Sequence, residues 1–278
     1  MFQIEHDGLT IELKAWHDFQ WLHEIGRVFC VFDHLISGNI CFGVDTGNQK
    51  VFVKYAGART KMYSGQPQAA IDRLMSAAER YQALKHPNLS PLIGHVQPGQ
   101  GLGLVFPWFD GFALAPLEMH LTSLHELPLI SRLALFDGLM DFIVQASGKD
   151  FLTAGLANQH ILIDFATNRS LFSSVDHFLQ MPASTPYPKL PGSPWYIPPE
   201  GYQPGAMLDE CANVYVLGAL AFTFFGNAYS KNLSGWTAGK LLFETAKHAV
   251  SEKQEQRMQK TKNFQKQWRL LILSMPGI

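Results

Sequence analysis

The chain of 278 residues lacks several features that would mark specialised classes of protein. Its three cysteines, Cys30, Cys41 and Cys211, form no C-x-x-C pair, which excludes a disulfide scaffold or a zinc site built on clustered thiols. Lys plus Arg (22) nearly balance Asp plus Glu (23), so the net charge of −1 offers no footprint for nucleic acid or anionic lipid. The longest apolar stretch, residues 214–225, is shorter than the ~20 residues that cross a bilayer. The N-terminus also lacks the cationic start and apolar run of a signal peptide. We therefore expect a cytoplasmic protein with neither nucleic acid nor a membrane as a partner.

The composition favours a folded chain with a large core. Hydrophobic residues make up 47% of the sequence and aromatic residues 12%, which excludes a disordered protein. At ~100–200 residues per domain, this length predicts two lobes or one large domain.

The first 110 residues alternate short apolar runs with turn residues. The pattern predicts strands over 27–32, 40–44 and 50–55, followed by a helix whose apolar face runs from Ile71 to Leu84. Pro87 ends that helix, and two more strands are expected over 89–96 and 102–106. We expect a lobe of five strands and one helix, preceded by an N-terminal extension over residues 1–20.

The remainder of the chain predicts a mainly helical lobe. Apolar residues recur at helical spacing from Leu129 to Ile143, and Ser147-Gly148 marks the end of that helix. Residues 182–199 contain seven prolines, too many for a helix or a central strand. A closing pair of helices is expected over 237–250 and 260–273.

Two motifs resemble conserved segments of protein kinases. Residues 192–200 read G-S-P-W-Y-I-P-P-E, which resembles the G-T-P-x-Y-x-A-P-E end of the kinase activation segment. Residues 214–218 read V-Y-V-L-G and resemble the V-x-S-L-G start of a buried helix in the larger kinase lobe. The resemblance implies an α+β, two-lobed protein kinase-like fold, with the small lobe over 21–106, a hinge over 107–112 and the large lobe over 113–278.

The resemblance implies a nucleotide site with ATP and Mg²⁺ as ligands. Residues 51–54 read V-F-V-K and resemble the kinase strand V-A-I-K, which assigns Lys54 to the phosphates of ATP and Glu79 as its ion-pair partner in the cleft between the lobes. The alternative for Lys54 is a solvated lysine at a strand end, and the alternative for Glu79 is a surface glutamate. The positions expected to contact the nucleotide also include Gly38 and Val44, in place of a full glycine-rich loop.

Residues 106–111 resemble the kinase hinge, and residues 175–178 occupy the place of D-F-G. With Phe106 as gatekeeper, Pro107 would offer its C=O and Phe109 its N–H to adenine. The alternative is a buried aromatic connector. Asp176 would carry Mg²⁺.

The catalytic loop departs from the kinase pattern H-R-D-L-x-x-x-N. Residues 161–164 match the strand that follows this loop, and counting back puts Gly155 at the catalytic base and His160 at the second metal ligand. Glycine offers no acceptor, and imidazole is a poor ligand for Mg²⁺. Asn213 stands where kinases carry an aspartate that anchors the loop. Asp150 or Asp164 could replace the base only if its carboxylate were displaced toward the catalytic position.

These departures favour a pseudokinase that binds a nucleotide or an unidentified protein and transfers phosphate weakly or not at all. One alternative is an atypical serine/threonine kinase or small-molecule phosphotransferase with a displaced carboxylate, and another is a scaffold that binds no nucleotide. Residues 52–57 read F-V-K-Y-A-G, as in a group of bacterial serine/threonine kinase-like proteins. The resemblance also predicts a buried ion pair between Glu200 and Arg257, because the guanidinium can bind a carboxylate through two parallel hydrogen bonds.

Overall fold

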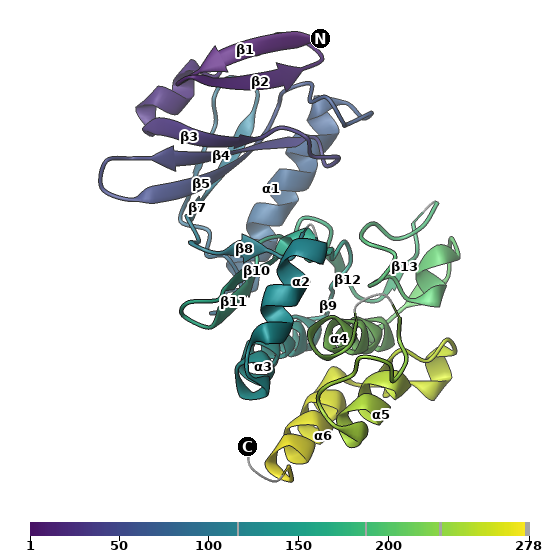
Figure 1. Ribbon diagram of the computed structural model, residues 1–278. Coiled ribbons are helices and arrows are strands. Elements are labelled where there is room, and N and C mark those ends of the chain that lie inside the picture. The colour runs from purple at the N-terminus through teal and green to yellow at the C-terminus, as the bar shows by residue number, and fades with distance from the viewer. Residues whose placement is uncertain (116, 187, 228–229, 276–278) are drawn as a thin grey trace. The chain divides into compact units, whose positions relative to one another are not determined.

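The computed structural model describes residues 1–115, 117–186, 188–227 and 230–275 and confirms the α+β class. The chain divides into two compact units (Figure 1). Unit 1 comprises residues 1–85 and 90–109, and unit 2 comprises residues 86–89 and 110–278. The short segment 86–89, which the sequence assigns to the small lobe, therefore belongs to unit 2.

Unit 1 is built on a five-stranded antiparallel sheet with the order β3-β4-β5-β7-β6. Its strands are β3 (Arg27–Phe32), β4 (Asn39–Asp45), β5 (Lys50–Ala56), β6 (Gly94–Val96) and β7 (Leu102–Pro107). Four of them agree with the predicted ranges to within one residue. The strand expected over 89–96 is shorter, because Pro91 has no N–H for the ladder and Leu89 instead forms an isolated bridge with Phe172.

Helix α1 (Pro67–Ala83) connects β5 to β6 and packs on β5 and β7 (Figure 1). Pro67 occupies the first turn, where its missing N–H costs nothing. The buried face consists of Ala70, Ile71, Leu74, Ala77 and Tyr81. Pro87 follows the helix end, as the sequence predicts.

The first residues of the chain form a hairpin that belongs to the core of unit 1. Strands β1 (Phe2–His6) and β2 (Leu9–Leu13) pair antiparallel through the turn Asp7-Gly8, in which both residues have positive φ. Ile11 and Leu13 pack with the buried face of β4, as does the 3₁₀ helix η1 (Gln20–Glu24) through Leu22. The segment treated in the sequence as an extension thus covers one face of the sheet.

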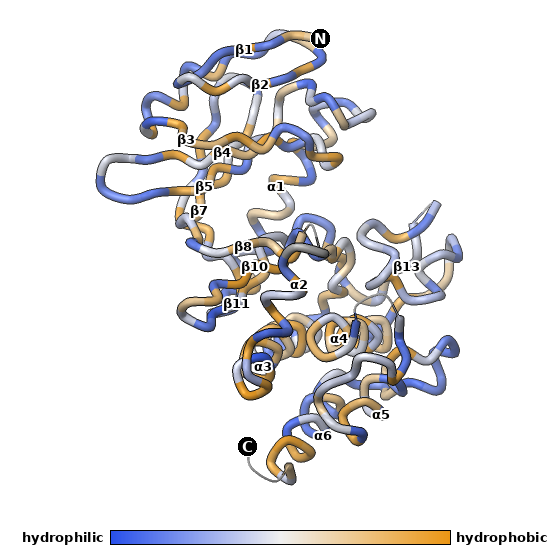
Figure 2. The backbone as a smooth tube through the Cα atoms, viewed as in Figure 1, coloured by the Kyte–Doolittle hydropathy of each residue, from blue (hydrophilic) through white to orange (hydrophobic). Residues whose placement is uncertain are grey.

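Unit 2 is mainly helical, with α2 (Leu117–Glu126), α3 (Leu129–Gly148), α4 (Glu210–Phe225), α5 (Lys240–Ala249) and α6 (Thr261–Leu273). Helix α4 is buried along almost its whole length, and most of its residues are hydrophobic (Figure 2). Asp209 caps its N-terminus by accepting a hydrogen bond from the Cys211 N–H. None of the helices in the described ranges is both long and apolar enough to span a bilayer.

Short strands and 3₁₀ helices shape the loops of unit 2. Strand β10 (Ile161–Asp164) pairs with β8 (Phe112–Ala113) and β11 (Arg169–Phe172), while β9 (Phe151–Leu152) pairs with β12 (Leu179–Gln180). The remaining pieces are β13 (Ala183–Ser184), β14 (Met207–Leu208), η2 (Asn158–His160), η3 (Pro199–Tyr202) and η4 (Gln254–Gln256). The described part of the proline-rich segment contains the two-residue strand β13 and a turn at 194–196, and η3 begins at Pro199.

Candidate functional site

Lys54 is a buried cation in the middle of the unit 1 sheet. Its side chain lies on α1's side of β5, and the residue is only 6% exposed. Its Nζ donates to the Tyr81 hydroxyl at 3.5 Å and lies 6.0 Å from the centroid of the Phe106 ring. Lysine is rarely buried to this extent, so the position is unlike that of a solvated strand-end lysine.

Glu79 does not pair with Lys54. The side chain of Glu79 is exposed on α1, and no ion pair within the described part of the chain involves it. Residues two apart on a helix do not share a face, so the face that turns Tyr81 toward Lys54 turns Glu79 away. The sequence already predicts Tyr81 on the apolar face of this helix. That prediction could have excluded Glu79, two residues earlier, as a partner of Lys54.

Val44 lies on the wrong face of the sheet for the predicted nucleotide contact. The residue opposite Lys54 on β4 is Cys41, and Val44, three positions further on, points to the other face. Val44 is fully buried there in the core that the N-terminal hairpin covers. The strand register thus places Cys41, and not Val44, on the same face of the sheet as Lys54.

The predicted hinge positions carry an aromatic cluster. Phe106 is 2% exposed and contacts the rings of Tyr81 and Phe52. Pro107 pairs with Val51, and the N–H of Trp108 donates to the Lys50 carbonyl. Phe109 is half-buried. Phe52, which replaces the alanine of V-A-I-K, shares Lys54's face of β5.

The two glycines that stand for a phosphate-binding loop are packed against side chains. Gly38 has φ +80°, and a Cβ there would lie 2.6 Å from the Tyr63 ring. A Cβ at Gly43 would meet Cys30 and Phe29 at the same distance. Both glycines therefore make room for neighbouring side chains in unit 1.

In unit 2, Asn213 anchors the loop that follows β9. Its Oδ1 accepts from the N–H of Thr153 at 2.8 Å and from the Thr153 hydroxyl at 2.7 Å. Its Nδ2 donates to the Ser147 hydroxyl and to the Phe151 carbonyl. An amide satisfies two donors and two acceptors at once, which a carboxylate cannot do. Asn213 therefore holds the loop without the aspartate of the kinase pattern.

The predicted base position is closed by packing. Gly155 has φ +80°, and a Cβ on it would lie 2.4 Å from the Cβ of His177. The Gly155 N–H also donates to the Pro191 carbonyl at 3.2 Å. Any side chain at this position would displace the backbone near His177, so a catalytic carboxylate cannot be accommodated there.

Neither substitute carboxylate is arranged as a base. Asp164 accepts hydrogen bonds from the N–H groups of Ala166 and Thr167 and from the Thr167 hydroxyl, and so stabilises the turn after β10. These bonds, led by the one from the Thr167 hydroxyl, lower the pKa of Asp164, which makes it a weaker base. Asp150 is exposed in the turn after α3 with φ 58°.

The two predicted metal positions lie on neighbouring segments of unit 2. Asp176 is 6% exposed, and three residues before it the Ser173 N–H donates to the His160 carbonyl at 2.8 Å. The Asp176 carboxylate is a suitable hard ligand for Mg²⁺, whereas His160 supplies only imidazole.

The expected Glu200–Arg257 ion pair is present. Arg257 donates to both carboxylate oxygens of Glu200, at 2.6 and 2.9 Å, and its side chain has no solvent exposure. Two further N–H groups donate to the carbonyls of Ser251 and Glu252, and the guanidinium stacks over Tyr215. Four of the five N–H groups of this buried cation thus meet acceptors.

A tyrosine network joins the end of the 192–200 motif to the loop and to α4. The hydroxyl of Tyr196 donates to Asn158 Oδ1 and contacts Thr223 Oγ1 at 3.0 Å, and burial raises the pKa of this tyrosine. The indole of Trp195 also donates to Thr223 Oγ1. The sequence analysis quoted both aromatic residues without assigning them this role.

Lys231 is a half-buried lysine that the sequence did not reveal. Its Nζ donates to the Trp195 carbonyl at 3.0 Å and the Tyr215 hydroxyl at 2.7 Å. Burial lowers its pKa to about 8. It fixes the 192–200 segment on α4.

No family model matches the chain, and no curated protein matches it.

Proposed function

We propose that the chain is a protein kinase-like pseudokinase, which binds ATP with Mg²⁺ and transfers phosphate very slowly or not at all. The proposal is supported by the two sequence motifs, by an antiparallel sheet whose third and fourth strands along the chain are connected by a helix, and by the buried Glu200–Arg257 pair. Fold alone does not decide function, so the argument rests on the residues of the site.

The observation that carries the proposal is the packing of Gly155 against His177. A missing base could be supplied by a small shift of a neighbouring carboxylate if the position were open. Here His177 fills the position, and the carboxylate of Asp164 already accepts hydrogen bonds within the turn after β10. Since phosphoryl transfer depends mostly on positioning and charge, these changes lower the rate rather than prevent nucleotide binding.

Lys54 supports retention of the nucleotide. The Nζ of Lys54, beside the rings of Tyr81 and Phe106, is the cation that the kinase resemblance assigns to the phosphates of ATP. Asp176 would hold one Mg²⁺ through its carboxylate. At the second metal position of the kinase pattern, His160 offers only an imidazole, which is a poor ligand for Mg²⁺.

The test is a thermal-shift titration with ATP, with and without Mg²⁺. We expect ATP to raise the melting temperature of the wild type and Lys54→Ala to abolish the shift, because the phosphates lose their buried cation. Lys50→Ala is the matched control, since Lys50 lies on the same strand and is exposed. An unchanged shift in Lys54→Ala would contradict nucleotide binding through this residue.

A second candidate is a protein-binding scaffold without a nucleotide. It is favoured by the aromatic cluster of Phe52, Phe106 and Trp108 and by the packing of Gly38 against Tyr63. No shift of the wild type with any nucleotide would support it. Turnover of radiolabelled ATP that Asp150→Asn removes would instead support the atypical phosphotransferase.

A further inference from the structure

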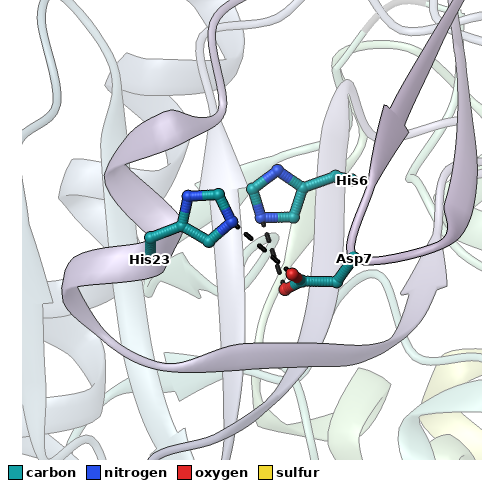
Figure 3. A group of neighbouring side chains, drawn as sticks. All are labelled: His6, Asp7 and His23. Atoms are coloured by element: carbon teal, nitrogen blue, oxygen red, sulfur yellow. Dashed lines mark ion pairs between the residues drawn. The ribbon is translucent and has the colours of Figure 1, made fainter.

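Three metal-ligating side chains meet beneath the N-terminal hairpin of unit 1 (Figure 3). His6 ends β1, Asp7 begins the turn to β2, and His23 lies on η1. The Nε2 of His6 is 3.7 Å from Asp7 Oδ2, and the Nε2 of His23 is 3.5 Å from Asp7 Oδ1. In Figure 3 a nitrogen of each ring points toward the carboxylate.

His6 has an unpartnered nitrogen at this position. The residue is 4% exposed, and its Nε2 has no hydrogen-bond partner in the described part of the chain. Leaving a buried polar atom unpaired costs about 1–3 kcal/mol, so the atom indicates that a ligand belongs there.

Asp7 is held in place independently of the histidines. The backbone N–H of Val28, on β3, donates to Asp7 Oδ2 at 2.7 Å. This bond orients the carboxylate, as partners behind a metal ligand commonly do. The Oδ1 atom then faces His23.

We propose that His6, Asp7 and His23 bind a divalent cation of the zinc class. Zinc bonds of about 2.0–2.2 Å separate tetrahedral ligands by about 3.4 Å, close to the two nitrogen–oxygen distances in this cluster. Two imidazoles and one carboxylate suit Zn²⁺ and its neighbours rather than Mg²⁺ or Ca²⁺.

The metal would connect the hairpin to the rest of unit 1. The two rings stack with centroids 4.5 Å apart, so one ring must turn for both lone pairs to meet at one ion. His23 can turn without repacking, because its side chain is 51% exposed. The exposed side of the cluster leaves a fourth position for water. Binding to the folded state alone would stabilise unit 1.

The experiment is a calorimetric titration of the full chain, freed of metal with a chelator, with ZnCl₂. We expect one ion per chain and a rise in melting temperature, and Co²⁺ should show the visible bands of tetrahedral coordination. Asp7→Asn keeps an acceptor for Val28 and tolerates the positive φ of this turn residue. Asp7→Asn and His23→Ala should each weaken Zn²⁺ binding by about tenfold or more, because even a residue that only supports a ligand contributes about 10–100-fold.

His34→Ala is the matched control. Its Nε2 lies 3.5 Å from Asp33 and 3.7 Å from Glu12, the same spacing of histidine and carboxylate, but its side chain is 64% exposed. Unchanged affinity in His34→Ala supports the site. The proposal is overturned if the wild type shows no saturable one-to-one binding, if both site variants bind as tightly as the wild type, or if His34→Ala loses as much affinity. Metal-free melting temperatures identify any loss that is due to unfolding.

Discussion

The surroundings of Lys54 in unit 1 and of Gly155 in unit 2 differ in what they could do for a nucleotide. Around Lys54, a charged group lies among aromatic rings, and the kinase resemblance assigns it to the phosphates of ATP. Around Gly155, a positioned amide holds the loop, and His177 fills the space that a side chain on Gly155 would need. The contrast shows that the proposed phosphate contact and the base position are tested by opposite changes, the removal of a cation and the addition of a carboxylate.

The largest effect is expected where unit 2 depends on a buried charge pair. Arg257→Ala would leave Glu200 desolvated and unpaired, which typically costs about 3–5 kcal/mol. Lys253→Ala and Lys260→Ala are controls. Lys260 pairs with Glu210 at 3.0 Å but its side chain is 65% exposed, so its loss should be small. Similar melting temperatures for all three variants would show that the pair does not stabilise the loop region.

The packing of the loop can be tested by restoring the missing carboxylate. We expect Gly155→Asp to lower the free energy of unfolding by about 1–3 kcal/mol more than Gly205→Asp, without creating activity. Gly205 has φ +83° with open space around it, so its variant measures the backbone strain alone. Urea unfolding gives both values. Equal destabilisation of the two variants, or phosphotransfer by Gly155→Asp, would mean that the loop is open.

The binding side of the comparison can be sharpened at Phe52. Its ring lies on Lys54's face of β5 and contacts Phe106 and Trp108. If the ring crowds the adenine position, Phe52→Ala should tighten ATP binding by about tenfold, the value of roughly 1.4 kcal/mol. Calorimetric titration with ATP and Mg²⁺ measures this change. The control is Phe2→Ala, on strand β1 of the N-terminal hairpin and 49% exposed. Weaker binding by Phe52→Ala alone would show that the ring is itself part of the site.

The smallest effect concerns pH. Burial lowers the pKa of His125, whose Nε2 lies 3.3 Å from the Thr223 carbonyl. The unfolded chain then binds more protons than the folded chain near the normal histidine pKa, so this residue makes stability fall as pH drops through that range. His125→Gln should reduce the slope of melting temperature against pH between neutral and mildly acidic conditions. A slope in that variant equal to that of the wild type would contradict the assignment.

The sequence predicted those parts of the molecule whose signals are local. Strand β3, helix α3 and the Glu200–Arg257 pair follow from alternation, helical spacing and a motif. The hairpin at residues 2–13 was missed, although residues 9–13 alternate apolar and polar side chains and Asp7-Gly8 is a typical hairpin turn.

Site residues that depend on register were harder to predict. Val44 was assigned by its place in a motif, but pairing of Cys41 with Lys54 turns Val44 to the opposite face. The predicted pairing of Glu79 with Lys54 was wrong for a similar reason, because Glu79 and Tyr81 lie on different faces of α1. The closure of Gly155 by His177 depends on two segments that are distant in sequence, and no local pattern could have revealed it.

The most direct test of the account is to recover the nucleotide that the protein binds. The full chain would be incubated with γ-labelled ATP and Mg²⁺ and separated from free nucleotide, and the bound label would be analysed by chromatography. We predict that the label is recovered as intact ATP, that the protein carries no phosphate, and that Lys54→Ala retains no label. Labelled protein or released phosphate at a rate typical of kinases, or no bound nucleotide in the wild type, would contradict the account.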